Sequence, residues 1–125
     1  MATVIMSKNA PAAAGPYSHA IKAAGLIFTA GQLAIDPATG AIVEGGPEEQ
    51  ARQTLTNIKH VLEDAGTSMD KVIKVTVFAT KLEYFADLAK VYKDFFSEPF
   101  PARSGMEVSK LPMNSMFEIE VVAEK

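Results

Sequence analysis

Arginine and glutamate in the last quarter of the sequence are the residues best suited to do chemistry. Arg103 follows Pro101-Ala102 at the predicted start of a strand, where its planar guanidinium suits a carboxylate better than a lysine would. A structural ion pair with Glu107 or Glu120 is an equally good interpretation of the residues alone. The only other arginine, Arg52, lies within a predicted helix and is explained as a surface charge.

Two acids and one aromatic residue complete this group of candidates. Glu118 and Glu120 are two residues apart, so they share one face of a predicted strand. Partial burial of that face in an intersubunit pocket would raise a carboxyl pKa and make the group useful for proton transfer. The alternative, which the sequence alone favours, is a solvated strand face. Tyr17 follows Gly15-Pro16 and is either a loop aromatic that closes a pocket or a packed plug.

Ser104 and the two histidines are weaker candidates. Ser104 lacks the Gly-x-Ser-x-Gly pattern and an evident His–acid pair, which argues against a serine hydrolase. His19 could be a general base, although an ordinary half-buried histidine of a β-run is the simpler interpretation. His60 lies off the apolar stripe of its helix and is expected on the solvated surface. Neither histidine has a ligand spacing, so no metal site is expected.

A strand lysine and a glycine pair have structural explanations that require no binding or catalytic role. Lys74 alternates with Thr76 on a strand face, and a solvated edge is a better interpretation than a pocket amine. Gly45-Gly46 precedes a helix, but Glu48 and Glu49 would repel an anion there, so no phosphate loop is expected.

Length and composition narrow the class of protein further. The 125 residues suit one domain, 1–125, and the absence of cysteine excludes disulfides, thiolate metal sites and thiol nucleophiles. A net charge of −3 gives no overall positive field, so a nucleic-acid partner is not expected. No segment has the roughly 20 apolar residues of a membrane span, and no leader pattern precedes the domain. The cytoplasm is therefore the expected location, with no membrane partner.

Short strand patterns dominate the first third of the chain. A strand is predicted at 3–6, a proline-rich loop at 11–16, a hairpin from strands 18–23 and 26–33, and a turn at 36–40. The spacing of apolar residues then changes to that of a helix, which is predicted to begin at Pro47 and to stop at Gly66. Its apolar face is formed by Ala51, Leu55, Ile58, Leu62 and Ala65.

The second half alternates strands with a second helix. Strand 72–79 is predicted to bury Ile73, Val75, Val77 and Ala79, and Phe85, Leu88, Tyr92 and Phe95 show helical spacing. Strands 104–109 and 117–123 follow. These elements predict an α+β fold with a mixed sheet of about six strands and two helices on one face. The uncovered sheet face mixes apolar residues with acids, which predicts a homo-oligomer with pockets where subunits meet.

Taken together, the motifs resemble the RidA/YjgF family, also called the L-PSP endoribonuclease family. The resemblance covers essentially the whole chain and rests on its motifs in order: Ala10-Pro11-Ala12-Ala13, Gly15-Pro16-Tyr17-Ser18, Phe28-Thr29-Ala30-Gly31-Gln32, Asp36-Pro37, Pro101-Ala102-Arg103-Ser104, Val108, Leu111-Pro112 and Glu118-Ile119-Glu120.

The resemblance implies a chorismate-mutase-like fold assembled as a homotrimeric barrel, with three intersubunit pockets and no cofactor. It also implies hydrolysis of 2-enamine or 2-imine acids, such as 2-aminoacrylate and 2-iminopropionate, to 2-keto acids and ammonia. In that reaction Arg103 would hold the substrate carboxylate and Glu118 would activate water. Tyr17 from a neighbouring subunit would close the pocket, Gly31 would allow close approach to ligand, and Ala30, Gly105 and Met106 would line the substrate site.

Three positions depart from the family pattern. Ala30 stands where a serine is usual, Gly105 replaces a frequent cysteine and Ala89 replaces a common asparagine. The lost serine hydroxyl concerns the substrate range more than the reaction type, since carboxylate capture and water attack need neither a serine nor a cysteine. The alternatives to a deaminase are an endoribonuclease or translation inhibitor, and a non-catalytic small-acid-binding or chaperone-like trimer.

Overall fold

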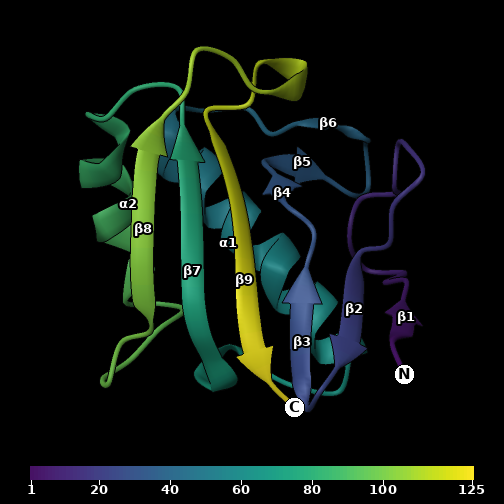
Figure 1. Cartoon of the computed structure of the whole chain (residues 1–125). Coiled ribbons are helices and arrows are strands. Elements are labelled where there is room, and N and C mark those ends of the chain that lie inside the picture. Colours follow the sequence, from purple (N-terminus) through teal and green to yellow (C-terminus); the bar gives the residue numbers. More distant parts are fainter.

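A mixed sheet with two helices on one of its faces forms the structure, a computed structural model that describes residues 1–125 (Figure 1). The strands of the main sheet are β1 (Thr3–Ile5), β2 (Ala20–Ala23), β3 (Leu26–Thr29), β4 (Gln32–Leu33), β7 (Val72–Ala79), β8 (Ala102–Glu107) and β9 (Phe117–Glu124). Their order is β1-β2-β3-β9-β7-β8, with β4 also paired to β9. The α+β prediction is confirmed, with seven strands in the main sheet rather than about six.

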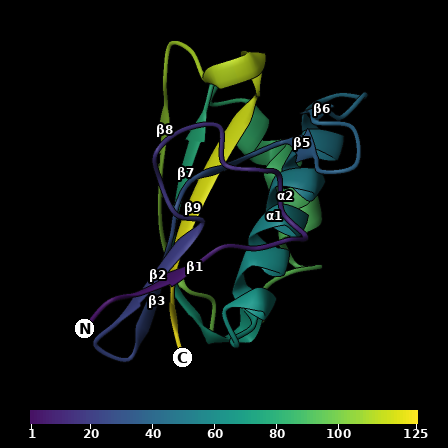
Figure 2. The same cartoon turned by 90° about the vertical axis from the view of Figure 1, so that its right-hand side faces the viewer.

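Both long helices lie on the same side of this sheet, as Figure 2 shows in side view. They are α1 (Pro47–Asp64) and α2 (Tyr84–Tyr92), with short helical turns at Met69–Lys71 and Pro112–Asn114. The predicted turn at 36–40 joins a separate two-stranded ribbon, β5 (Ile35–Asp36) and β6 (Ala41–Ile42). None of the helices has both the length and the apolar character that crossing a membrane requires.

The first helix begins and ends where its sequence signals predict. Pro47 occupies the first helical position, and the Glu49 carboxylate accepts the Gly46 N–H at 2.7 Å. Beyond the helix, Gly66 has a φ of +86°, a conformation that other residues rarely adopt. Every residue of the predicted apolar stripe is buried.

The predicted hairpin is present, but its second strand is interrupted. Ala24 and Gly25 both have positive φ, as a tight two-residue turn between β2 and β3 requires. The predicted run 26–33 divides into β3 and β4, because the chain leaves the ladder at Ala30 and Gly31. This break lies at the edge of the candidate site described below.

The face assignment of β7 is wrong at its first two positions, because Val72 was expected on the face opposite Val75 and Ile73 on the same face. Ile73 is 43% exposed, whereas Val72 is buried, because the register with β9 shifts between Val72 and Lys74. Such an irregularity turns the next side chain to the other face. From Lys74 onwards the predicted alternation holds, with Val75 and Val77 buried.

The second half of the chain differs from its predicted boundaries in two places. Strand β8 begins at Ala102, because its ladder with β7 starts directly after Pro101, and it ends at Glu107, where β7 also ends. Helix α2 ends at Tyr92, and the following turn buries Phe96 rather than the predicted Phe95, which is partly exposed.

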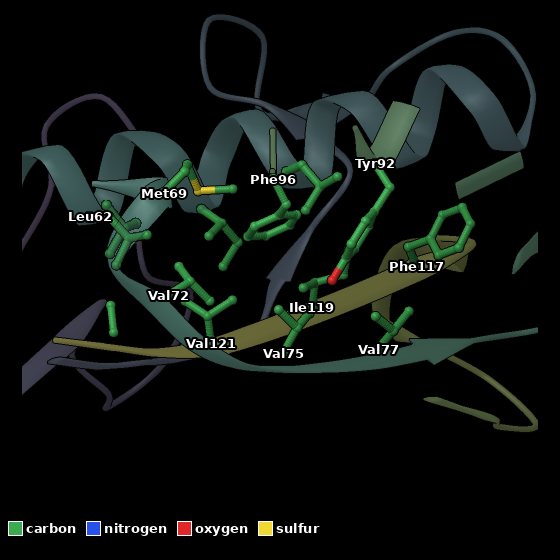
Figure 3. Packing of buried hydrophobic residues seen from close by; sticks show 14 of the residues in the cluster. Leu62, Met69, Val72, Val75, Val77, Tyr92, Phe96, Phe117, Ile119 and Val121 are labelled. Atoms are coloured by element: carbon green, nitrogen blue, oxygen red, sulfur yellow. The ribbon is translucent and has the colours of Figure 1, made fainter. Parts of the chain in front are cut away.

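The hydrophobic core lies between the helices and one face of the sheet. It contains 22 buried residues, and Figure 3 shows Val75, Ile119 and Val121 of the sheet facing Leu62 and Phe96 from the helical layer. The opposite face of the sheet has no covering layer (Figure 2).

We call this uncovered surface the open face and define it by Phe28, Val122, Phe78, Met106 and Glu118, which are neighbours in the register of adjacent strands. Phe28 and Met106 are 43% and 42% exposed. The predicted uncovered face is thus present in the single chain.

Candidate functional site

A cleft of about 440 Å³ lies beside the interrupted strand. Its walls come from the proline-rich loop between β1 and β2, the β3–β4 segment Ala30–Leu33 and the turn before β9 that contains Pro112 and Met113, and Glu118 of β9 also lines it. Three regions of the sequence, around residues 11–17, 30–35 and 112–118, therefore meet here.

Glu118 carries the only side-chain carboxyl that lines this cleft, and this carboxyl lies against Gly31. A Cβ atom at position 31 would stand 2.8 Å from Glu118 Cγ, so a side chain there would force the Glu118 side chain to shift. Burial raises the pKa of Glu118, and the negative charge of Glu120 raises it further. A half-buried carboxyl with a raised pKa can both accept and donate a proton.

The other predicted residues of this wall are placed as follows. Tyr17 and Ala30 line the cleft in the same chain as Glu118. The Tyr17 hydroxyl accepts the Ala14 N–H at 3.4 Å, and the ring is 48% exposed, so it borders the cleft without being a packed plug. Gly31, expected to allow the close approach of a ligand, lines the same cleft, and the Glu118 side chain lies against it.

Arg103 lies elsewhere, on the helix-covered side of edge strand β8. It pairs in register with the buried Val75, and its guanidinium carbon stands 4.8 Å from the centre of the Tyr92 ring. This arrangement is a cation–π contact. Arg103 forms no ion pair, and Glu107 instead accepts the Leu82 N–H at 3.0 Å, so neither predicted structural partner binds this arginine.

A second cavity, of about 330 Å³, surrounds Arg103. Its other walls are the end of α2 and the segment before β8, contributed by Ala89, Tyr92, Lys93, Phe100 and Pro101. The cavity therefore combines a guanidinium with largely apolar and aromatic walls, which suits a carboxylate attached to a small organic group.

Two predicted lining residues of β8 face in different directions. Gly105 faces the helices, and a Cβ atom there would stand 2.5 Å from Phe85 Cε1. Met106 pairs with Phe78 and belongs to the open face. Phe85 and Tyr92 were interpreted from their helical spacing as core residues, so that spacing did not reveal that they also pack against Gly105 and Arg103.

The structure therefore divides the candidate residues into two groups. Tyr17, Ala30, Gly31 and Glu118 form one cleft, and Arg103 lies in a separate cavity. Residues that face each other across a ladder share a sheet face, so the pairings Arg103–Val75 and Phe78–Glu118 place Arg103 and Glu118 on opposite faces. One chain does not bring these two side chains together.

The weaker candidates have structural contacts. The Lys74 ammonium donates to the Ser104 hydroxyl at 2.9 Å on the exposed surface, and neither histidine is hydrogen-bonded to Ser104. Arg52 lies on the surface, as predicted, where it pairs with Asp94 at 2.9 Å. His60 is bonded to the Asn9 carbonyl at 3.0 Å, and His19, expected to be half-buried, is only 2% exposed.

Comparison with known proteins identifies the family. The profile of the family Endoribonuclease L-PSP matches residues 7–125. The chain belongs to the L-PSP family, that is, the RidA/YjgF family.

The similar proteins cover almost the whole of this L-PSP family chain. A RutC family protein of Pyrococcus horikoshii is 50% identical over 100% of the chain and 99% of its own length. A cattle (Bos taurus) protein named 2-iminobutanoate/2-iminopropanoate deaminase is 42% identical over 96% of the chain and 88% of its own length. The crystal structure of E. coli TdcF with bound serine is 37% identical, with a TM-score of 0.92 and coverage of 98% of each chain.

Family membership confirms the predicted chorismate-mutase-like α+β fold. The structure accounts for the glycine at position 105, where the resemblance led us to expect a cysteine. At Gly105, the Phe85 ring occupies the space that a side chain would need. The glycine and the phenylalanine are therefore a matched pair in this chain.

Proposed function

We propose that this protein hydrolyses 2-imino acids and their 2-enamine tautomers to 2-keto acids and ammonia, at a site shared by two copies of the chain. The observation that carries the proposal is the Glu118 carboxyl, which lines a cleft with its pKa raised by burial. The name of the 42% identical cattle relative supports the reaction. The serine bound to E. coli TdcF supports a ligand that is small and carries a carboxylate.

The proposed chemistry needs only water and the side chains of this chain. The ionised Glu118 carboxylate removes a proton from water as the oxygen attacks the C=N carbon, and it passes this proton to the imine nitrogen to give a carbinolamine. Glu118 then removes the carbinolamine hydroxyl proton and delivers it to the amine nitrogen as the C=O bond forms and the C–N bond breaks. One water is consumed, and one keto acid and one ammonia are formed.

Arg103 supplies the carboxylate-binding group of this site. Its planar fork can form two parallel hydrogen bonds with a carboxylate, which fixes the direction of the C=N bond. Within its own chain the guanidinium has no anionic partner, so it is available for this role. Ala89, beside Arg103, and Ala30, beside Glu118, offer no polar atom from their side chains, so an apolar substituent on the substrate is favoured.

A shared site follows from the placement of the two groups. Because Arg103 and Glu118 lie on opposite sheet faces, a neighbouring copy must bring its Arg103 to the Glu118 cleft. Assembly through the open face would also cover its exposed apolar side chains, including Phe28 and Met106. We propose a homotrimer, the assembly that the family resemblance implies, with three such sites.

Arg103→Lys tests the reaction against its matched control, Arg52→Lys. With 2-aminoacrylate generated enzymatically in the assay, the wild type should accelerate loss of the enamine, and Arg103→Lys should lose most of this acceleration, because a point charge cannot replace the fork. Arg52→Lys should keep it, since Arg52 only forms a surface ion pair. Equal rates for wild type, Arg103→Lys and a protein-free sample would refute the deaminase proposal.

Mixing two inactive variants tests the shared site. Trimers reassembled from equal amounts of Arg103→Ala and Glu118→Gln would have both wild-type groups at about a quarter of their interfaces, and should recover about that share of activity. No recovery, or a monomeric mass by light scattering at micromolar concentration, would contradict the shared site.

The same variants address the two other functions. RNA cleavage that persists through purification and disappears in Arg103→Ala would support the endoribonuclease that the family is named for. The net charge of −3 weighs against a polyanionic substrate. Binding of a keto acid that depends on Arg103, without turnover, would indicate a small-acid-binding trimer.

A further inference from the structure

His19 is a buried side chain near the cleft with both ring nitrogens hydrogen-bonded, and the proposed chemistry does not use it. Its ring is 2% exposed. The Ser7 N–H donates to Nδ1 at 2.8 Å, and Nε2 lies 2.8 Å from the Pro11 carbonyl oxygen. Because an amide only donates and a carbonyl only accepts, the ring must be neutral with its proton on Nε2.

The partners of His19 belong to the segments that form the cleft. Pro11 lines the cleft itself, and Ser7 begins the loop that continues through Tyr17. The His19 carbonyl accepts the Ala30 N–H at 2.9 Å, beside the Gly31–Glu118 contact. One residue thus fixes the start of the proline-rich loop, its middle and the interrupted strand.

The neighbouring polar groups are not arranged for catalysis. The Ser7 hydroxyl donates to Asp64, whereas the His19 ring accepts from the backbone N–H of Ser7 and not from its hydroxyl. A nucleophilic serine would need the imidazole on its hydroxyl oxygen. Asp64 of α1 is also bonded by Asn9, so this group anchors the segment to the helix.

We propose that His19 is a positioning residue of the cleft: its neutral Nε2–H ring clamps Ser7 and Pro11 of loop 7–18 together, its backbone carbonyl joins this part of the loop to Ala30, and Tyr17 is thereby held beside Glu118. Without the clamp, the wall formed by residues 11–17 would separate from the β3–β4 segment. The effect of the clamp on turnover rests on the proposed function, whereas its effect on the loop does not.

Two substitutions at His19 separate the clamp from simple burial. In His19→Gln the side-chain carbonyl can accept from Ser7 and the amide can donate to Pro11, so both bonds can be rebuilt. His19→Leu keeps an apolar volume but loses both bonds. The matched control is His60→Leu, which removes a single surface contact from the same loop, at Asn9.

Hydrogen exchange of the purified protein measures the clamp directly. In His19→Leu we expect the amides of 12–17 to exchange at least about tenfold faster, and those of β7 and β9 to stay close to wild type. His19→Gln and His60→Leu should both stay close to wild type. In the deaminase assay, His19→Leu should raise KM for 2-aminoacrylate about tenfold with a smaller change in kcat.

Two results would overturn the clamp: unchanged exchange at 12–17 in His19→Leu, or a ¹⁵N spectrum of the wild type that places the His19 ring proton on Nδ1. The spectrum decides even where His19→Leu fails to fold. Faster exchange in His19→Leu together with a wild type that has no turnover would refute the deaminase and leave the clamp in place.

Discussion

The Gly31 backbone and the Glu118 carboxyl group are in direct contact, and this contact requires a glycine. A Cβ atom at position 31 would lie 2.8 Å from both Cγ and Cδ of Glu118. The missing side chain at position 31 leaves room for the carboxyl of Glu118, on β9, beside the interrupted strand at the edge of the cleft. The position of the proposed proton-transfer group therefore depends on the small size of a residue on the neighbouring segment.

Gly31→Ala should displace Glu118 and reduce the deaminase rate with little loss of the fold. A misplacement of about 1 Å can cost roughly 100-fold in rate, so we expect a loss of this size in kcat/KM. Gly46→Ala is the control, because a Cβ atom there would have an ordinary 3.6 Å contact with Glu49. Full activity in Gly31→Ala would contradict the role of this contact.

The pH dependence of activity should report the raised pKa of Glu118. The proposed base works only when ionised, so kcat/KM should fall as the pH drops through this pKa, at a higher pH than for an ordinary glutamate. Glu120→Gln removes the like charge and should move this acid limb to lower pH. An acid limb that does not move in Glu120→Gln would argue that another group is titrating.

The raised pKa of Glu118 should also make the free energy of unfolding decrease with rising pH. A carboxyl whose pKa is higher in the folded than in the unfolded state binds more protons when folded, so stability falls as pH rises through the interval between the two values. Glu118→Gln should remove this decrease. Urea unfolding at several pH values and one protein concentration would measure it, and a wild-type stability that rises over this interval while Glu118→Gln is flat would contradict the assignment.

Tyr92→Phe should stabilise the protein. The Tyr92 hydroxyl is buried without a hydrogen-bond partner, and Figure 3 shows it pointing toward the sheet near Ile119. Burial accordingly raises the pKa of this phenol, opposed by the positive charge of Arg103. Removing the unpaired oxygen should increase the free energy of unfolding by about 1 kcal/mol in urea titration and keep a ring beneath Arg103.

Tyr84→Phe, in the partly exposed first turn of the same helix, is the control and should give no gain. Destabilisation by Tyr92→Phe would mean that the hydroxyl has a bonding partner in the folded assembly.

Asp64→Asn should weaken the attachment of the N-terminal segment. The Ser7 hydroxyl and, to a smaller extent, Asn9 donate to Asp64 and lower the pKa of its carboxyl. A lowered pKa contributes stability above the unfolded-state value, and this contribution is lost as pH falls through the folded-state value. We expect Asp64→Asn to lose about 0.5 kcal/mol at neutral pH and to reduce the acid dependence.

Glu63→Gln, one residue away, has no hydrogen bond to Ser7 or Asn9 and should match the wild type in the same titration. Equal acid dependence in Asp64→Asn and the wild type would exclude the Ser7–Asp64 contact as its source.

Local signals predicted most of the secondary structure. The proline, acids and apolar stripe of α1 and the turn at Ala24-Gly25 act within a few residues of the backbone they control, so the sequence indicates them directly. The errors lie where a partner strand decides. Ile73 is exposed because of a register shift with β9, and β8 begins at Ala102 because of its ladder with β7.

In the candidate site, too, the sequence indicated what each residue could do but not which distant residues it contacts. The residue types alone indicated that Arg103 suits a carboxylate and that Glu118 could transfer protons. They did not indicate that Phe85 fills the space beside Gly105 or that His19 joins Ser7, Pro11 and Ala30, because these contacts join segments far apart in the chain.

The sequence by itself determined the chemistry available to this protein: no thiol, two histidines without ligand spacing, and one arginine outside the first helix. It also determined the helix ends and turns, which depend on local backbone preferences. Only the tertiary structure decided that Tyr17 and Glu118 share a cleft and that Arg103 faces away from it. The reason is that strand pairing, rather than local sequence, sets the face of the sheet on which each side chain lies.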